Sequence, residues 1–235
     1  MVNHQKEPRE QVIHLGGLGL FTGLLPLITI HITYLVSAWQ GHVDWCIPYW
    51  DACTSVSATG RDGISYFIFK GAMIPAIVLM TLFWIINHRW LQALGYPRGK
   101  GIGWLGFTAG AFLLVYVLSL GHAGDAFHMA RQIGTAGYVG MTGIAQILLG
   151  AVLWRSGYPL LVRGGGRLVK LSALTLTIAI VSLILEAIPA VDYGEINHAF
   201  DWTLIVLLNI HGIGVALLWH KAGLAVTMPD TMNLK

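Results

Sequence analysis

The sequence has few charged residues for its length. Asp, Glu, Lys and Arg together make up 11% of the 235 residues, whereas hydrophobic residues make up 55%. Soluble domains carry about 25% charged residues, and a soluble protein of this length has too small a core to bury so much apolar surface. The composition therefore predicts an integral membrane protein. The formal net charge of +3 does not indicate a nucleic-acid partner, because the basic residues lie where membrane topology would place them.

Several signature motifs are also absent. The chain contains no N-x-S/T glycosylation acceptor, no H-E-x-x-H zinc motif and no G-x-S-x-G nucleophile motif. Gly164-Gly165-Gly166 is not a phosphate-binding loop, because no strand precedes it and no Gly-Lys-Ser/Thr follows it. No repeat and no long linker divides the chain. We therefore expect one integral membrane domain over residues 1–235, whose chemistry depends on isolated polar residues.

Long apolar runs dominate what the sequence does contain. Six of them extend over about 11–39, 64–88, 102–122, 132–154, 168–190 and 199–220. Each has the roughly 20 residues that an α-helix needs to cross about 30 Å of hydrocarbon. Because lipid offers the backbone no hydrogen-bond partner, spans of this length are expected to be helices. The predicted fold is an all-α bundle of six transmembrane helices.

The charges that flank these runs are sorted by sign. Most of the 14 Lys and Arg residues lie near the chain ends and in the second and fourth connections. By the positive-inside rule, both termini are expected in the cytoplasm. All nine Trp residues lie near a predicted boundary, where interfacial anchors are expected. The membrane itself is left open: plasma membrane, bacterial inner membrane and endomembrane all fit.

The longest connection, about residues 40–63, contains both cysteines, Cys46 and Cys53. On the outer side of a membrane this loop would be in an oxidising compartment. We favour a disulfide over two free thiols, with a stabilisation of about 2–3 kcal/mol. A spacing of seven residues without a neighbouring His is not a zinc signature. A loop of this length in a compact protein favours a functional role.

Titratable side chains gather in two stretches near the outer surface. The first runs from His122 to Arg131, and the second from Glu195 to Trp202. Helical spacing lets Glu195, His198 and Asp201 face one cavity. The predicted catalytic residues are His198, Asp201, His128 and Asp51.

The same stretches contain the donors of a possible metal site. Zinc takes His and carboxylate ligands, and the candidate ligands are His122, Asp125, His128 and His198. The set equally suits a His/Asp acid–base pair. A purely structural role, with Asp125 and Asp201 as helix caps, is as well supported by the sequence.

Deeper polar residues are expected to find a partner or face a cavity. We predict that Lys70 pairs with Glu186, and its snorkelling to the interface is the alternative. His211 is expected to hydrogen-bond Asn209 or a backbone carbonyl. The residues predicted to contact lipid are Trp50, Tyr49, Trp202, Arg131 and Lys70.

The segment that leaves the first span resembles a known family. It reads Thr33-Tyr34-Leu35-Val36-Ser37-Ala38-Trp39-Gln40-Gly41-His42-Val43-Asp44, followed by Ile47-Pro48-Tyr49. This is similar to the damage-regulated autophagy modulators and FGF-receptor-activating protein, a family that includes a factor for GPI-anchor lipid remodelling. Asn197-His198 with Asp201-Trp202 resembles the start of the family's last span, although Asp201 replaces a Glu. The resemblance implies six spans and a role with membrane lipids.

The sequence leaves three functions open, and leaves open whether the protein is an enzyme. The first is handling or remodelling of membrane lipids through a polar His/Asp pocket at the outer leaflet. The second is a zinc-dependent membrane hydrolase resembling ceramidases, with zinc as its cofactor. The third is a non-catalytic scaffold whose partners are other membrane protein subunits.

Overall fold

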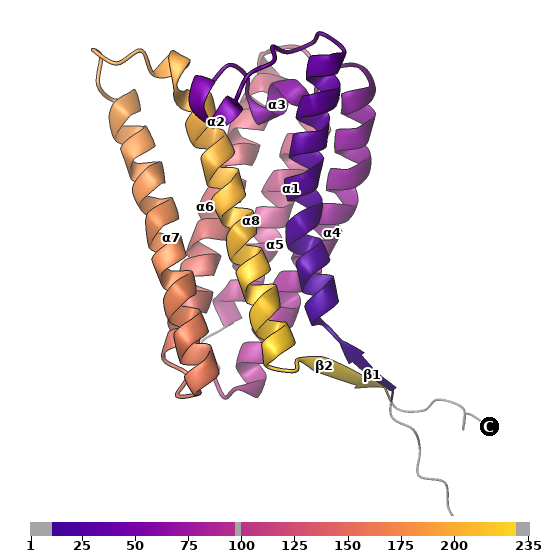
Figure 1. The fold of residues 1–235 in the computed structure, drawn as a ribbon, viewed down its shortest axis with the longest axis vertical. Helices are drawn as coiled ribbons and strands as arrows, with labels where there is room; N and C mark the ends of the chain where they lie inside the picture. Colours follow the sequence, from indigo (N-terminus) through magenta and orange to yellow (C-terminus); the bar gives the residue numbers. More distant parts are fainter. Residues whose placement is uncertain (1–10, 97–99, 229–235) are drawn as a thin grey trace, which may run out of the picture.

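The computed structural model describes residues 11–96 and 100–228 and confirms the six-helix membrane bundle (Figure 1). Each long helix has the length and the apolar composition to cross a membrane. These helices are α1 (Gly16–Trp39), α4 (Gly63–Ala93), α5 (Lys100–Ser119), α6 (Asp125–Trp154), α7 (Pro159–Glu186) and α8 (Asn197–Lys221). The short elements are β1 (Gln11–His14), α2 (Pro48–Asp51), α3 (Val56–Thr59), the 3-10 helix η2 (Tyr193–Glu195) and β2 (Ala225–Met228).

Two short strands mark one end of the bundle. β1 pairs antiparallel with β2, with Gln11 opposite Met228 and His14 opposite Ala225. Both strands lie beyond the ends of α1 and α8 (Figure 1). We call this the strand end, and the opposite end, which carries residues 40–62, the loop end. The pairing joins the segments that flank the first and last spans. Both segments lie at the same end of the bundle, as an even number of spans requires.

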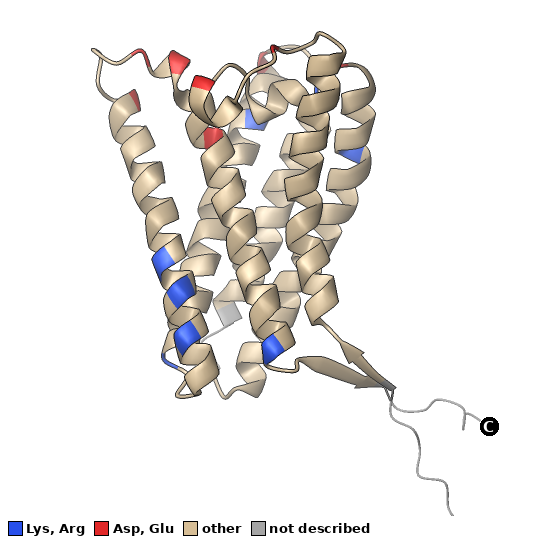
Figure 2. Cartoon of the chain, viewed as in Figure 1, with Lys and Arg blue, Asp and Glu red and all other residues tan. Residues whose placement is uncertain are grey.

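Charge is distributed unequally between the two ends (Figure 2). Acidic residues lie at the loop end, and most described basic residues, including those of α7, lie toward the strand end. By the positive-inside rule, the strand end is expected on the cytoplasmic side. The cytoplasmic location of both termini stays a prediction, and residues 1–10 and 229–235 lie outside the described residues.

The largest difference from the expected boundaries concerns α7. It begins at Pro159 rather than near residue 168, with Pro in the first turn, where its missing N–H is not needed. Gly164-Gly165-Gly166 therefore lies inside a helix rather than in a connection. A Cβ at Gly164 would clash with Leu218 of α8, and one at Gly165 would clash with the backbone of α6. The glycines thus let α7 pack closely on both neighbours.

The role of interfacial anchor, expected of every Trp, is wrong for four of them. Trp39, Trp45, Trp50, Trp104 and Trp154 are exposed, as anchors should be, but Trp84, Trp90, Trp202 and Trp219 are buried in the core. The Trp219 indole donates to Asn87 Oδ1 at 3.2 Å. A buried indole keeps its N–H satisfied in this way while its ring fills the core.

Candidate functional site

Residues 40–62 fold over the loop end and are pinned to α1. Cys46 and Cys53 form a disulfide with their Cα atoms 6.6 Å apart, which confirms the predicted pairing. The Tyr34 hydroxyl accepts from the Cys46 backbone N–H at 2.8 Å and donates to the Cys46 carbonyl at 2.6 Å. The first half of the loop is therefore held both covalently and by a buried hydroxyl.

Trp202 pins the same loop to α8. Its indole donates to the Thr54 carbonyl at 2.9 Å, and the side chain is fully buried. Its ring packs edge-on against Tyr34 and Tyr49, with centroids 6.0 and 5.6 Å away. Tyr49 and Trp202, both predicted to contact lipid, thus form an aromatic core under the loop.

A hydrogen-bonded chain runs from this loop into α1. The Tyr49 hydroxyl lies 2.6 Å from His31 Nε2, and His31 Nδ1 lies 2.7 Å from the Leu27 carbonyl. Because a carbonyl can only accept, Nδ1 carries the proton and Nε2 accepts from the phenol. Burial raises the pKa of Tyr49, which keeps this donor protonated. No sequence pattern indicates this pair, because His31 is an isolated His within a predicted span.

We expect Tyr49→Phe to lower the free energy of unfolding by about 1 kcal/mol, since His31 Nε2 loses its donor. Thermal unfolding in detergent micelles measures the change. Tyr158→Phe is the matched control, because Tyr158 is exposed at the strand end. Equal melting temperatures for the two variants would contradict a role for the Tyr49–His31 bond.

Three charged side chains act electrostatically on the buried Tyr116 of α5. They are Asp201 of α8, Arg131 of α6, and Arg61, which lies between α3 and α4. Arg131 also donates to the carbonyls of Ser119 and His122 at 3.2 and 3.0 Å. We call Arg61, Tyr116, Arg131 and Asp201 the Tyr116 cluster. It gathers two positive charges and one negative charge from four separate parts of the chain.

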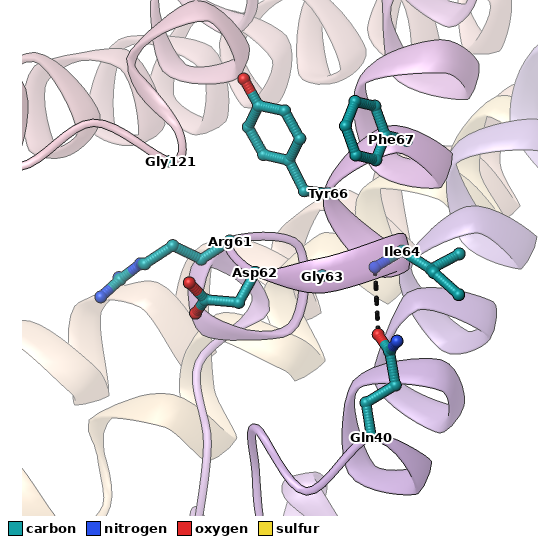
Figure 3. Close-up of a pocket in the computed structure, with 8 residues that line it drawn as sticks. All are labelled: Gln40, Arg61, Asp62, Gly63, Ile64, Tyr66, Phe67 and Gly121. Atoms are coloured by element: carbon teal, nitrogen blue, oxygen red, sulfur yellow. Dashed lines mark hydrogen bonds between the residues drawn. The ribbon is translucent and has the colours of Figure 1, made fainter.

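A shallow pocket of about 430 Å³ opens beside this cluster. Figure 3 shows Arg61 and Asp62 on one side of it, with Tyr66 and Phe67 on another. Ile64 N donates to Gln40 Oε1 at 3.1 Å, which ties the end of α1 to the start of α4. Arg61 is the residue that the pocket and the Tyr116 cluster share.

Lys70 lies just below this pocket on α4. Its Nζ donates to the Tyr66 hydroxyl at 2.8 Å and sits 4.4 Å from the Tyr66 ring centroid. A second contact of 3.5 Å reaches the Leu118 carbonyl. The predicted Lys70–Glu186 pair is therefore wrong: Lys70 bonds within α4 and to α5, whereas Glu186 ends α7.

The four predicted catalytic residues have separate surroundings. Asp201 lies in the Tyr116 cluster, and His198 lies one turn before it on α8. The buried Nδ1 of His198 has no hydrogen-bond partner among the described residues. Asp51 instead accepts from Ile47 N at 2.7 Å within the loop, and His128 is exposed near the start of α6. Asp201 and His198 are the two of these residues that share a helix, one turn apart.

The predicted metal ligands are not assembled. Among the residues that the structure describes, no group of three or more His, Cys, Asp or Glu side chains could hold a metal ion. His122 stacks on Phe127, with ring centroids 4.7 Å apart, and Asp125 begins α6. His128 is on α6, whereas His198 is on α8, and no third donor joins either within the described part of the chain.

The remaining residues predicted to contact lipid divide into two kinds. Trp50 is 86% exposed on the loop, as an interfacial anchor would be. Arg131 instead donates to the backbone carbonyls of Ser119, at the end of α5, and His122, in the connection to α6. Arg61, which the sequence did not single out for binding, takes the position next to the pocket.

Comparison with known proteins gave no match to a protein-family model, a curated protein or a solved structure.

Proposed function

We propose that the protein binds a membrane lipid at the loop end of the bundle, with the phosphate-bearing headgroup beside Arg61. On this proposal, handling or remodelling of that lipid is the function. The observation that supports it is a pocket with the Arg61 guanidinium and the Asp62 carboxylate on one side and the aromatic side chains of Tyr66 and Phe67 on another.

The guanidinium of Arg61 can receive an anionic group in this place. The Asp62 carboxylate also lines the pocket, so its two charged side chains are of opposite sign. Within the described part of the chain, Arg61 makes one long hydrogen bond, 3.4 Å from Nη2 to Ser57 Oγ, and most of its donors are left for a ligand. A guanidinium offers parallel N–H donors that match the oxygens of a phosphate.

The apolar side of the pocket favours a lipid over a free phosphate. Ile64 and Phe67 line it and are 53% and 72% exposed, at the start of a membrane-spanning helix. Acyl chains would cover these side chains while the headgroup reaches Arg61. Lys70, one turn deeper, adds a snorkelling cation at the depth of the interface.

Removing the Arg61 charge tests the binding proposal. We expect Arg61→Gln to lose about 1.5–3 kcal/mol of binding free energy, or roughly 10- to 100-fold in affinity for phospholipid. Native mass spectrometry of the purified protein, titrated with a phospholipid in detergent, measures the affinity. Arg155→Gln is the control, because Arg155 is exposed near the strand end. Equal affinities for the two variants would contradict the proposed headgroup site.

Remodelling requires chemistry in addition to binding, and Asp201 with His198 is the pair we assign to acid–base work. The lipid profile of a host that expresses wild type is compared with profiles from Asp201→Asn and His198→Ala. A change that both variants abolish supports remodelling. Identical profiles from three folded proteins would remove the enzymatic part and leave lipid binding standing.

A further inference from the structure

A second cavity lies inside the bundle, between α1, α4, α6 and α8, and apart from the pocket at Arg61. Its volume is about 30 Å³. The polar side chains that line it are Thr22, Trp84, Tyr138, Thr142, Gln146 and Asn209. A polar lining of this kind is unusual inside a membrane bundle, where most core contacts are apolar.

Two of the lining groups are buried without a partner. Trp84 is 2% exposed and Thr142 is 3% exposed, and neither Trp84 Nε1 nor Thr142 Oγ1 has a hydrogen bond to any described residue. Leaving a buried donor unsatisfied costs about 1–3 kcal/mol. Native structures rarely leave such groups unpaired, so a partner in the cavity is expected.

Acceptors for that partner lie on the opposite walls. Gln146 Nε2 donates to the Leu208 carbonyl at 2.8 Å, and Asn209 Nδ2 donates to the Ile205 carbonyl at 2.8 Å. Each amide therefore uses its N–H group on a helix backbone and keeps its side-chain oxygen as an acceptor. The cavity thus combines an indole donor, a hydroxyl and two amide oxygens.

We propose that this cavity holds ordered water, with at least one molecule that accepts from Trp84 Nε1 and hydrogen-bonds Thr142 Oγ1. The volume suffices, because one water needs about 10–15 Å³ by this measure. A cation fits poorly, because the partly positive hydrogen of the indole N–H would face it. The water links α4 to α6 within the membrane and is independent of the proposed lipid site.

X-ray radiolysis of water, followed by mass spectrometry, tests the proposal on the full-length protein in detergent. Hydroxyl radicals formed from a bound water oxidise the nearest side chains. Trp84 is expected to oxidise several-fold faster than Trp219. Trp219 is the matched control, because it is equally buried and its indole is already paired with Asn87.

Variants at Thr142 separate bound water from chance opening of the bundle. Thr142→Val keeps the side-chain shape and removes the hydroxyl, so it is expected to slow oxidation of Trp84 and leave Trp219 unchanged. Thr142→Ser keeps the hydroxyl and is expected to preserve fast oxidation, which provides a folded comparison if the valine variant is unstable. Equal oxidation of Trp84 and Trp219 in wild type, or fast Trp84 oxidation that persists in a folded Thr142→Val protein, would overturn the proposal.

Discussion

Gly134→Ala is expected to destabilise the bundle by about 1–3 kcal/mol, as overpacking of a close contact does. A Cβ at this position of α6 would lie 2.8 Å from Tyr116 N and 2.9 Å from the Phe112 carbonyl of α5. These neighbours are backbone atoms, so the contact can be relieved only by moving one helix away from the other. Because Tyr116 is the centre of the polar cluster, such a shift would also disturb Asp201 and Arg131.

Gly140→Ala on the same helix is the control. A Cβ there meets nothing within 4 Å, so the substitution should be neutral or should stabilise the helix by up to about 1 kcal/mol. Thermal unfolding in one detergent compares both variants with wild type. Equal destabilisation by the two substitutions would mean that helix propensity, rather than close packing of α5 on α6, explains these glycines.

Loss of the disulfide is the second large effect. We expect Cys46→Ser/Cys53→Ser to lower the free energy of unfolding by about 2–3 kcal/mol, because the unfolded chain without the bond gains conformational entropy. The loss should be concentrated in residues 40–62, where Tyr34 and Trp202 hold the backbone of Cys46 and Thr54. Thermal unfolding gives the total, and limited proteolysis of the loop locates it.

A reducing agent provides the control for this prediction. It should destabilise wild type to about the level of the double variant and leave the double variant unchanged. A wild-type protein that melts at the same temperature with and without reductant, under conditions that reduce the bond fully, would contradict a stabilising role for the disulfide.

The six spans could be predicted because length and apolar composition are local properties of each run. The Cys46–Cys53 pairing could be predicted because the chain contains no other cysteine. Span ends were less certain, since the apolar run of α7 begins several residues after the helix itself. Pro159 and the basic residues that follow it belong to the helix even though they are not apolar.

The site was predicted only in part, because its contacts join distant segments. Trp202 and Thr54 are separated by 148 residues, and Tyr49 and His31 by 18. No spacing rule links such positions, so Asp201 could be chosen as a polar residue but its neighbours Arg61 and Tyr116 could not. The Lys70–Glu186 prediction failed for the same reason: opposite charge does not determine which helices are adjacent.

The burial of four tryptophans could not be predicted for a related reason. Trp202 is near the end of an apolar run, as an interfacial anchor would be, yet it faces the protein and not the lipid. Position along a helix fixes depth in the membrane, whereas the neighbouring elements decide which face is covered. The loop over α8 covers Trp202, and nothing in the local sequence indicates that cover.

Labelling from one side of the membrane tests most directly whether the loop end, with its proposed lipid site, faces outward. Ala123→Cys introduces an exposed thiol at the loop end, and Tyr158→Cys introduces one at the strand end. Wild type is the blank, because its disulfide-bonded cysteines do not react with a maleimide. An impermeant maleimide on intact cells should label Ala123→Cys at once and Tyr158→Cys only after the membrane is permeabilised. Labelling of Tyr158→Cys alone in intact cells would show that the bundle has the opposite orientation, and would contradict a headgroup site in the outer leaflet.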